Sequence, residues 1–525
     1  MSVNSFLFYK ISVLYLVIPI ILFFLGWLRI GVGLFFSLLL VLAVSTFFKM
    51  VKNSPAIDNS FYIIKEHYIA FIILFLFLLS TGNTGFVGCW GYDIPWRNAI
   101  YQDLIRQPWP VIYDYSSSIL CYYMAFWLVP AEISSLLHLN EFGSNIVLFL
   151  WMYMGLILIF FLLNDILQPK REQIILITII FLFFSGINTL GMLLKSFFIE
   201  PTPLITNYPS WASWEFTNFN INGKDIVYLM RSTYLNLADI YNQYFALTLS
   251  TLMLLKFRHK IGCYAFVGLL TLPYSPIGFI GLFVVELSEF LCKVLKNKKK
   301  KNWSDCIKEP FSATNVFGIL AIFPVFYFYY SMNVNASTVL NYSHSTASSF
   351  FYVPWHQFSG ANIILLLIYY YIYFIAYARL IYDSYKNNNL YWIILLCLVI
   401  FPFFKIGNSA DFTFNATICP YFILCVFIIK HILQSLNNNN FRIKDLVLLF
   451  FLSIAMLTPV IQITSSLRGT YINGLVSYKY KTLENAWDTS LLRDSFRDKK
   501  IDGFRNFLAQ DYTEKIFYVY FLKDH

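Results

Sequence analysis

The chain has 525 residues, of which 58% are hydrophobic, 20% aromatic and only 13% charged. A soluble domain could not cover its surface with so few charged residues, so the composition excludes an ordinary cytosolic globular protein. The formal net charge of +10 does not indicate nucleic-acid binding, because the basic residues stand in short clusters between apolar segments, where lysine and arginine set membrane topology. The run Lys298–Lys301 is accordingly expected in a cytoplasmic loop beside anionic lipid.

Apolar segments of membrane-spanning length recur along the whole chain. A hydrocarbon core about 30 Å thick requires about 20 apolar residues in a helix, and segments this long can satisfy their backbone groups inside lipid only as helices. The sequence therefore predicts an all-α, polytopic transmembrane protein with about 11 spans, at about 11–28, 30–48, 67–83, 145–164, 173–194, 241–256, 312–331, 361–383, 390–405, 418–436 and 446–464.

Two further apolar pieces are not predicted to be simple spans. The piece at about 263–293 contains Pro273 and Pro276, and we expect a broken helix or hairpin that returns to the side from which it entered. Within it, Glu289 is expected to extend to the interface near Lys293, and the role of Glu286 is open. The piece at about 118–137, with Pro130 and many Tyr and Trp residues, predicts a helix that lies at the membrane interface.

With these two pieces set aside, the basic residues between spans fall on one side of the membrane. By the positive-inside rule this side is the cytoplasm, so the N-terminus is predicted to be cytoplasmic and the C-terminus extracytoplasmic. The abundance of Ile, Asn, Lys and Phe is typical of an AT-rich bacterial genome and favours a bacterial inner or plasma membrane. The clusters are Lys49, Lys52 and Lys65; Lys170 and Arg171; Lys256, Arg258 and Lys260; Lys293–Lys301; Lys386; and Lys430, Arg442 and Lys444.

The predicted topology divides the chain into two parts. Residues 1–464 form a transmembrane domain whose long outer loops begin with the one at about 84–144. Residues 465–525 are mixed in charge and predict a small helical appendage on the extracytoplasmic side.

The first outer loop has a distinctive order of features. Asp93 comes shortly after a span ends, a helix-like segment with Asp103 and Arg106 follows, and a Trp-Pro turn leads into an aromatic helix that ends near Phe142-Gly143. The next span begins near Asn145.

This layout resembles the GT-C superfamily, the multispanning glycosyltransferases that take sugars from polyprenyl-phosphate carriers. The resemblance covers mainly residues 85–165 and implies a GT-C-like fold with interfacial helices in the first outer loop. Two features depart from the family pattern: the loop follows the third span rather than the first, and Asp93 is followed by Ile94 rather than by a second acid. The first departure suggests two additional N-terminal helices. The second leaves it open whether the reaction uses a divalent metal, and no other cofactor is implied.

The resemblance implies a role for each charged group in the outer loops. Asp93 would be the catalytic base, because a carboxylate near the interface can take the proton of an acceptor hydroxyl as it attacks the anomeric carbon. The leaving lipid phosphate needs cations to absorb its charge. The candidates for that role are Arg97, Arg106, Lys195, Arg231 and Lys405.

Aromatic and polar residues in the outer loops predict sugar binding. Indole rings stack on the apolar faces of sugars while nearby carboxylates accept hydroxyl protons; the alternative for each Trp is an aromatic belt at the membrane surface. The acceptor- and sugar-binding candidates are Trp96, Trp211, Trp214, Glu200, Glu215, His356 and Asp411.

Three functions are compatible with these features. The leading one is a glycosyltransferase that moves a sugar from a polyprenyl-phosphate-linked donor to a cell-envelope glycan or lipid-linked acceptor, with membrane lipids and no nucleic acid as further partners. The second is an envelope polysaccharide polymerase or ligase, which would be expected to carry several arginines in a large late outer loop. The third is a lipid-linked sugar transporter or flippase, which would be expected to show paired halves and charges within its spans.

Overall fold

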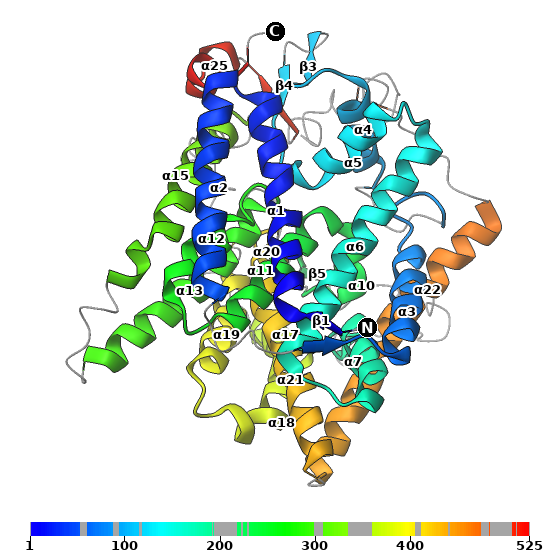
Figure 1. The fold of residues 1–525 in the computed structure, drawn as a ribbon. Coiled ribbons are helices and arrows are strands. Elements are labelled where there is room, and N and C mark those ends of the chain that lie inside the picture. Colours follow the sequence, from blue (N-terminus) through cyan, green and yellow to red (C-terminus); the bar gives the residue numbers. More distant parts are fainter. Residues whose placement is uncertain are drawn as a thin grey trace.

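The computed structural model describes most of the chain and shows a bundle of helices with three small sheets (Figure 1). The residues outside the description are 1, 53–59, 88–93, 115–117, 192, 194–217, 222–223, 228–229, 299–307, 334–359, 405–410, 439–440, 474–481, 484–506, 511 and 524–525.

The first half of the bundle contains three of the long apolar helices, Ser5–Trp27, Ile30–Lys52 and Glu141–Leu167. In chain order its helices are α1 (Ser5–Trp27), α2 (Ile30–Lys52), α3 (Lys65–Ser80), α4 (Ile94–Arg106), α5 (Ala125–Leu136), α6 (Glu141–Leu167), η3 (Arg171–Gln173), α7 (Ile174–Leu182), α10 (Thr233–Asp239) and α11 (Tyr241–Lys256).

The second half is more often interrupted. Its helices are η4 (Ile261–Cys263), α12 (Tyr264–Leu269), α13 (Pro276–Lys298), η5 (Glu309–Phe311), α15 (Ala313–Ser331), α17 (Gly360–Tyr370), the π-helix η8 (Tyr371–Ile375), α18 (Ala376–Tyr385), α19 (Asn389–Ile400), η9 (Phe401–Phe403), α20 (Asp411–Ala416), α21 (Ile418–Asn437), α22 (Ile443–Asn473), η11 (Tyr512–Glu514) and α25 (Ile516–Tyr520).

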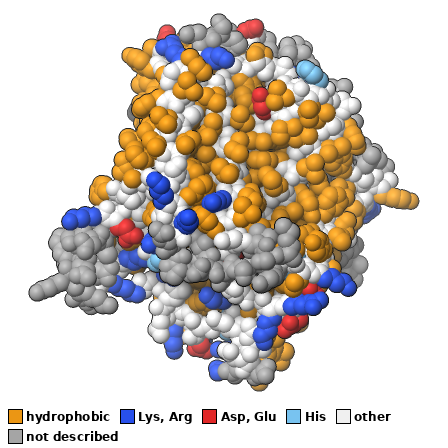
Figure 2. Space-filling model, viewed as in Figure 1, with side chains coloured by type: hydrophobic (Ala, Val, Ile, Leu, Met, Phe, Trp, Pro, Cys, Tyr) orange, Lys and Arg blue, Asp and Glu red, His pale blue; other side chains and the backbone are white. Residues whose placement is uncertain are grey.

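Each apolar segment predicted as a span contains a helix. Among the described residues, six helical segments are both long and apolar enough to cross a membrane: Ser5–Trp27, Ile30–Lys52, Glu141–Leu167, Ala313–Ser331, Asp411–Asn437 and Ile443–Tyr471. Large hydrophobic side chains such as Leu34 and Phe35 on α2 are more than half exposed. Figure 2 shows hydrophobic side chains over a broad zone of one face, with many Lys and Arg side chains below it. The chain therefore has the surface of an integral membrane protein.

The centre of the bundle is formed by α11 and α21, both of which are buried along nearly their whole length. The side chains of α11 are unusual for such a position, because Asn242, Gln243 and Thr251 are all 5% exposed or less. Gln243 is satisfied by Ser275, whose hydroxyl donates to Oε1 at 2.6 Å. Asn242 has no hydrogen-bond partner among the described residues. Burying polar side chains inside a membrane-spanning bundle costs free energy, and such side chains are frequently functional.

One end of the bundle collects the basic connections between helices, and we call it the basic end. Arg171 pairs with Glu66 at 2.7 Å, and Gln173 donates to Asn437 at 2.8 Å. Lys444 pairs with Asp383 at 2.6 Å. These contacts join connections that are remote in sequence, so Arg171 and Lys444, two of the basic residues predicted to share one side, lie at the same end of the structure.

The opposite end carries α4, α5 and α25, and we call it the loop end (Figure 1). Strands β3 (Ile112–Tyr113), β4 (Ser118–Leu120) and β7 (Leu508–Gln510) form an antiparallel sheet there, with β4 in the middle. The other two sheets are the antiparallel pairs β1 (Ser2–Asn4) with β2 (Ser60–Tyr62), and β5 (Asn218–Ile221) with β6 (Lys224–Val227).

The apolar piece at 263–293 is broken where the prolines predict. A helix-free turn follows Leu269, and Pro276 begins α13. The two arms meet again at the basic end, where Arg258 pairs with Glu289 at 2.7 Å and Lys293 donates to the Tyr264 hydroxyl at 2.8 Å. The piece is thus a hairpin whose two ends lie on the same side of the bundle.

Three local expectations are wrong. Residues 118–120 form a strand, so the helix expected over 118–137 is the shorter α5. The aromatic helix expected to end near Phe142-Gly143 ends at Leu136; Phe142 and Gly143 lie in the first turn of α6, where Asn140 caps the helix by accepting from the Gly143 N–H at 2.9 Å. The last long helix, α22, continues past 464 to Asn473, and the following tail contributes a strand as well as helices.

Candidate active site

The first outer loop folds as a pair of short helices against the end of the bundle. α4 and α5 pack together, and the Tyr101 hydroxyl on α4 donates to the Ser144 carbonyl on α6 at 2.8 Å. α5 is tied to the central helix α11, because the Trp127 indole N–H donates to the Tyr241 hydroxyl at 2.9 Å. The loop is therefore fixed to the bundle by bonds at both of its helices.

The C-terminal tail completes this loop. Strand β7 adds to β4, the Cys121 N–H donates to the Phe507 carbonyl at 2.8 Å, and the Lys523 N–H donates to the Trp27 carbonyl at 2.9 Å. Asp103 on α4 is fully buried, and its Oδ2 accepts from the Tyr113 hydroxyl at 2.9 Å and from the Leu483 N–H at 3.1 Å. Residues 400 positions apart thus form one unit at the loop end.

Three of the predicted site residues lie on α4. Trp96 is partly buried and its ring lies 5.7 Å from that of Phe507 in the tail. Arg97 is 2% exposed. Arg106 is exposed in the last turn of α4, where it donates to Gln102 at 3.3 Å. Arg97 therefore lies inside the loop assembly, whereas Arg106 faces away from it.

Arg231 has the most distinctive environment of the predicted phosphate ligands. Its Nη2 pairs with Asp239 at 2.8 Å, and its guanidinium carbon lies 5.0 Å from the centre of the Phe414 ring. Nε and Nη1 are buried and have no hydrogen-bond partner among the described residues. An unsatisfied buried donor costs about 1–3 kcal/mol, and more when it is charged. Each of these donors can give a charge-assisted hydrogen bond to an anion such as a phosphate or carboxylate.

Two side-chain oxygens next to this arginine extend the polar cluster. Asn236 Nδ2 donates to the Arg231 carbonyl at 3.3 Å, and Asn415, next to Phe414, donates to the Asp411 carbonyl at 2.9 Å. The Oδ1 atom of each asparagine is buried without a hydrogen-bond partner in the described part of the chain. Such acceptors are suited to ligand hydroxyl groups.

Helix α10, which follows Arg231 directly, packs on the end of α3. The Tyr234 hydroxyl donates to the Ser80 carbonyl at 2.8 Å, and the Asn83 amide donates to the Leu237 carbonyl. The segment after α3 continues along the chain to Asp93, the predicted base. The start of the first outer loop and the end of the second are therefore in direct contact.

Helix α20 brings the short loop near 411 to the same place. Asp411 begins this helix and is exposed, whereas Phe412 and Thr413 are buried. Phe414 contacts Arg231, as described above. The structure thus brings together two sequence-predicted residues, Arg231 and Asp411, on neighbouring elements.

The remaining predicted site residues lie outside the described residues. They are Asp93, Lys195, Glu200, Trp211, Trp214, Glu215, His356 and Lys405.

Sequence reasoning missed Asn236, Asp239 and Asn415. Asp239 lies between two apolar stretches with no motif around it, and its role depends on the fold of α10 back toward Arg231. Single asparagines carry no signal without an alignment or a structure.

Two ionisable groups at the loop end are excluded as neutral-pH proton carriers. Burial raises the pKa of the Tyr101 hydroxyl and of the Cys121 thiol well above their usual ranges. Cys121 is therefore not a candidate nucleophile. The described part of the chain contains no group of three His, Cys, Asp or Glu residues that could hold a metal ion.

Comparison with known proteins does not assign the chain to a family. No family model matches it, and no curated protein or solved structure matches it significantly.

Proposed function

We propose that this chain is a membrane glycosyltransferase of GT-C type that transfers a sugar from a polyprenyl-phosphate-linked donor to a cell-envelope glycan or lipid-linked acceptor. The reaction takes place at the loop end, which we infer to be the extracytoplasmic face. A single displacement at the anomeric carbon inverts its configuration. Whether a divalent metal assists is left to experiment.

The proposed topology has about 11 spans, with the basic end in the cytoplasm of a bacterial inner or plasma membrane. Support comes from the ion pairs and hydrogen bonds that gather Arg171, Arg258 and Lys444 at one end of the bundle. The opposite end holds α4, α5 and the C-terminal tail.

The observation that carries the proposal is the contact between α10 and the end of α3. It brings Arg231, with two buried donors that have no partner among the described residues, to the base of the loop that contains Asp93. A transferase of this kind needs an anion-binding group at membrane depth and a base near it, because the leaving lipid phosphate and the attacking hydroxyl react at one carbon.

In the proposed reaction, Asp93 takes the proton of the acceptor hydroxyl while its oxygen attacks the anomeric carbon. The bond from that carbon to the lipid phosphate breaks, and the phosphate departs with its electron pair. Arg231 donates to the phosphate through Nε or Nη1, and Asp239 fixes the guanidinium through Nη2. We propose that Asn236 and Asn415 accept hydrogen bonds from sugar hydroxyls.

The test is an activity assay on the purified full-length protein in lipid, with a panel of polyprenyl-phosphate sugars. Wild type is compared with Asp93→Asn and with Asp114→Asn, which removes an exposed carboxylate from the same loop. Transfer that is lost only in Asp93→Asn, with unchanged thermal melting, supports the proposal. Full activity of Asp93→Asn removes this residue from the mechanism, and absence of transfer with every donor contradicts the proposed reaction.

A lipid-linked sugar flippase is the second candidate. It is favoured by one observation, the buried acids of α13 within the bundle, because intramembrane charges are characteristic of transport proteins. A flippase would move a fluorescent lipid-linked sugar across a proteoliposome membrane without forming a new glycosidic bond, so the two functions give different products.

A further inference from the structure

A second chemically distinctive place lies on α13, far along the chain from the first outer loop. Glu286 is 3% exposed, and neither carboxyl oxygen has a hydrogen-bond partner among the described residues. Buried acids are ordinarily paired or hydrogen-bonded, because an isolated carboxylate is strongly disfavoured away from water. Glu286 therefore needs a specific explanation.

The Glu286 carboxyl packs against the neighbouring helix α12. The carboxyl lies against the backbone of Gly268 on α12, where an added Cβ would be 2.5 Å from Oε2 and 3.2 Å from Cδ. Gly268 thus allows the carboxyl to approach the α12 backbone closely. A single carboxyl group without other oxygen ligands does not form a metal site, and the described residues contain no suitable cluster.

A second acid stands one turn along α13 toward the basic end. Glu289 Oε1 accepts from Arg258 Nε at 2.8 Å and lies 2.7 Å from Nη2. Its Oε2 is buried and has no partner in the described part of the chain. Residues three apart share a helix face, so this oxygen is the nearest acceptor along α13 on the way from Glu286 to the basic end.

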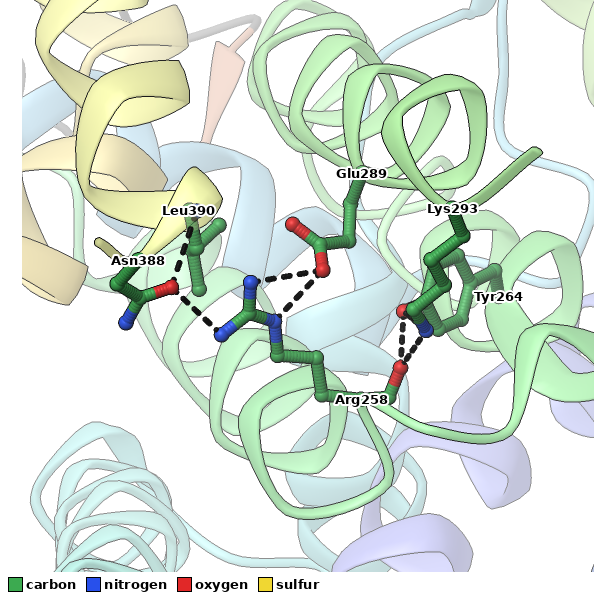
Figure 3. Close-up of polar contacts among 6 residues, drawn as sticks. All are labelled: Arg258, Tyr264, Glu289, Lys293, Asn388 and Leu390. Atoms are coloured by element: carbon green, nitrogen blue, oxygen red, sulfur yellow. Dashed lines mark hydrogen bonds and ion pairs between the residues drawn. The ribbon is translucent and has the colours of Figure 1, made fainter. Parts of the chain in front are cut away.

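Arg258 lies between the two acids of α13, Glu286 and Glu289, and the protein surface. Its side chain is 30% exposed, and Nη1 donates to Asn388 Oδ1 at 2.9 Å (Figure 3). Figure 3 also shows Lys293 and Tyr264 around the Arg258 carbonyl, on the other side of the arginine. The ionisable groups around α13 at this level are Arg258, Cys263, Tyr264, Glu289, Lys293 and Cys419.

We propose that Glu286 is a proton-binding site inside the bundle, neutral in the resting protein and exchanging its proton with the basic end through Glu289. A proton that leaves the Glu286 carboxyl is accepted by Glu289 Oε2, and reloading is the reverse transfer. Arg258 holds the Glu289 carboxylate in place through its Nε and Nη2 contacts. The ligand of this site is the proton itself, and the inference does not depend on the glycosyltransferase proposal.

The test is infrared difference spectroscopy on the purified full-length protein in lipid at neutral pH. A neutral carboxylic acid gives a C=O stretching band that is separate from the bands of carboxylates. The band is expected to be lost in Glu286→Gln and to remain in Glu289→Gln and in Glu172→Gln, an exposed control. If Glu286→Gln does not fold, Glu286→Leu removes the same acid. Identical wild-type and Glu286 variant spectra would show an ionised Glu286 and overturn the proposal.

The exchange route is tested on the same samples after transfer to D₂O. The carboxyl band shifts as deuterium replaces the proton, and the rate of this shift reports access to solvent. We expect slower exchange in Glu289→Gln than in wild type, with the rate in Glu172→Gln unchanged. Equal rates in all three proteins would exclude Glu289 as the route.

Discussion

The hydroxyl of Tyr113 donates a hydrogen bond of 2.9 Å to Oδ2 of Asp103, and both side chains are buried. The same oxygen accepts from the N–H of Leu483, in the C-terminal tail. One carboxylate therefore joins the helix of the first outer loop, the following strand and the tail. This arrangement helps to hold the tail at the loop end.

Replacement of Asp103 by alanine is expected to release the tail. The change leaves the Tyr113 hydroxyl and the Leu483 N–H without their acceptor, at about 1–3 kcal/mol for each buried group. Limited proteolysis should then cut within residues 474–510 faster than in wild type. Asp114→Ala, which removes an exposed carboxylate from the same loop, should leave the cleavage rate unchanged; equal protection of both variants would contradict the role assigned to Asp103.

Replacement of Arg231 by lysine is expected to weaken donor binding without unfolding the protein. Lysine keeps a positive charge beside Asp239 but lacks the additional donors Nε and Nη1 of the guanidinium. Loss of one charge-assisted hydrogen bond of about 1.5–3 kcal/mol predicts a donor KM raised about 10-fold to 100-fold. Steady-state kinetics measure the donor KM, with Arg106→Lys as the control at an exposed arginine. An unchanged donor KM in Arg231→Lys would count against phosphate binding at this residue.

Replacement of Phe507 by leucine is expected to affect acceptor binding through Trp96. The two rings lie 5.7 Å apart, and an aromatic pair contributes about 0.5–1.5 kcal/mol beyond its buried area. The backbone bonds of β7 remain, so the tail stays in place while Trp96 loses its neighbour. We expect the acceptor KM to rise about 2-fold to 10-fold. Phe517→Leu, which alters a tail residue packed on Tyr329, should leave the acceptor KM unchanged. The same rise in acceptor KM in both variants would indicate a general loosening of the tail.

At the basic end, His431 links three helices. Its Nε2 lies 2.8 Å from Asp445 Oδ1, and its Nδ1 lies 2.8 Å from the Ser384 hydroxyl. His431→Leu would leave the Asp445 carboxylate buried without this partner, which predicts a loss of about 3–5 kcal/mol and a clearly lower melting temperature. Ser384→Ala removes only a hydrogen bond at an exposed hydroxyl and should change the melting temperature little. Similar melting of the two variants would show that the His431–Asp445 contact is not a stabilising one.

The positions of the helices followed closely from the sequence. Apolar runs such as 241–256 and 418–436 became α11 (Tyr241–Lys256) and α21 (Ile418–Asn437) because a long apolar segment has no other way to bond its backbone away from water. The break at Pro273 and Pro276 was predictable for a similar reason, since proline removes an N–H donor and obstructs the preceding turn. The clustering of basic connections at one end agreed with the charge bias.

The outer loops were less predictable, because short elements there depend on partners that are remote in sequence. Residues 118–120 form a strand since β7, almost 400 positions later, offers the backbone partners that a helix would have satisfied internally. The sequence predicted only that Asp103 lies in a helix-like segment. In the structure its carboxylate accepts a hydrogen bond from the tail.

By itself, then, the sequence determined that this chain is a helical membrane protein, where its helices run, and which end collects the basic residues, because these depend on hydrophobicity and charge along the chain. Only the tertiary structure decided that Arg231 has two donors without a described partner, that it lies near the segment leading to Asp93, and that Glu286 is buried against Gly268. Those features depend on distances between segments that the linear order of residues does not contain.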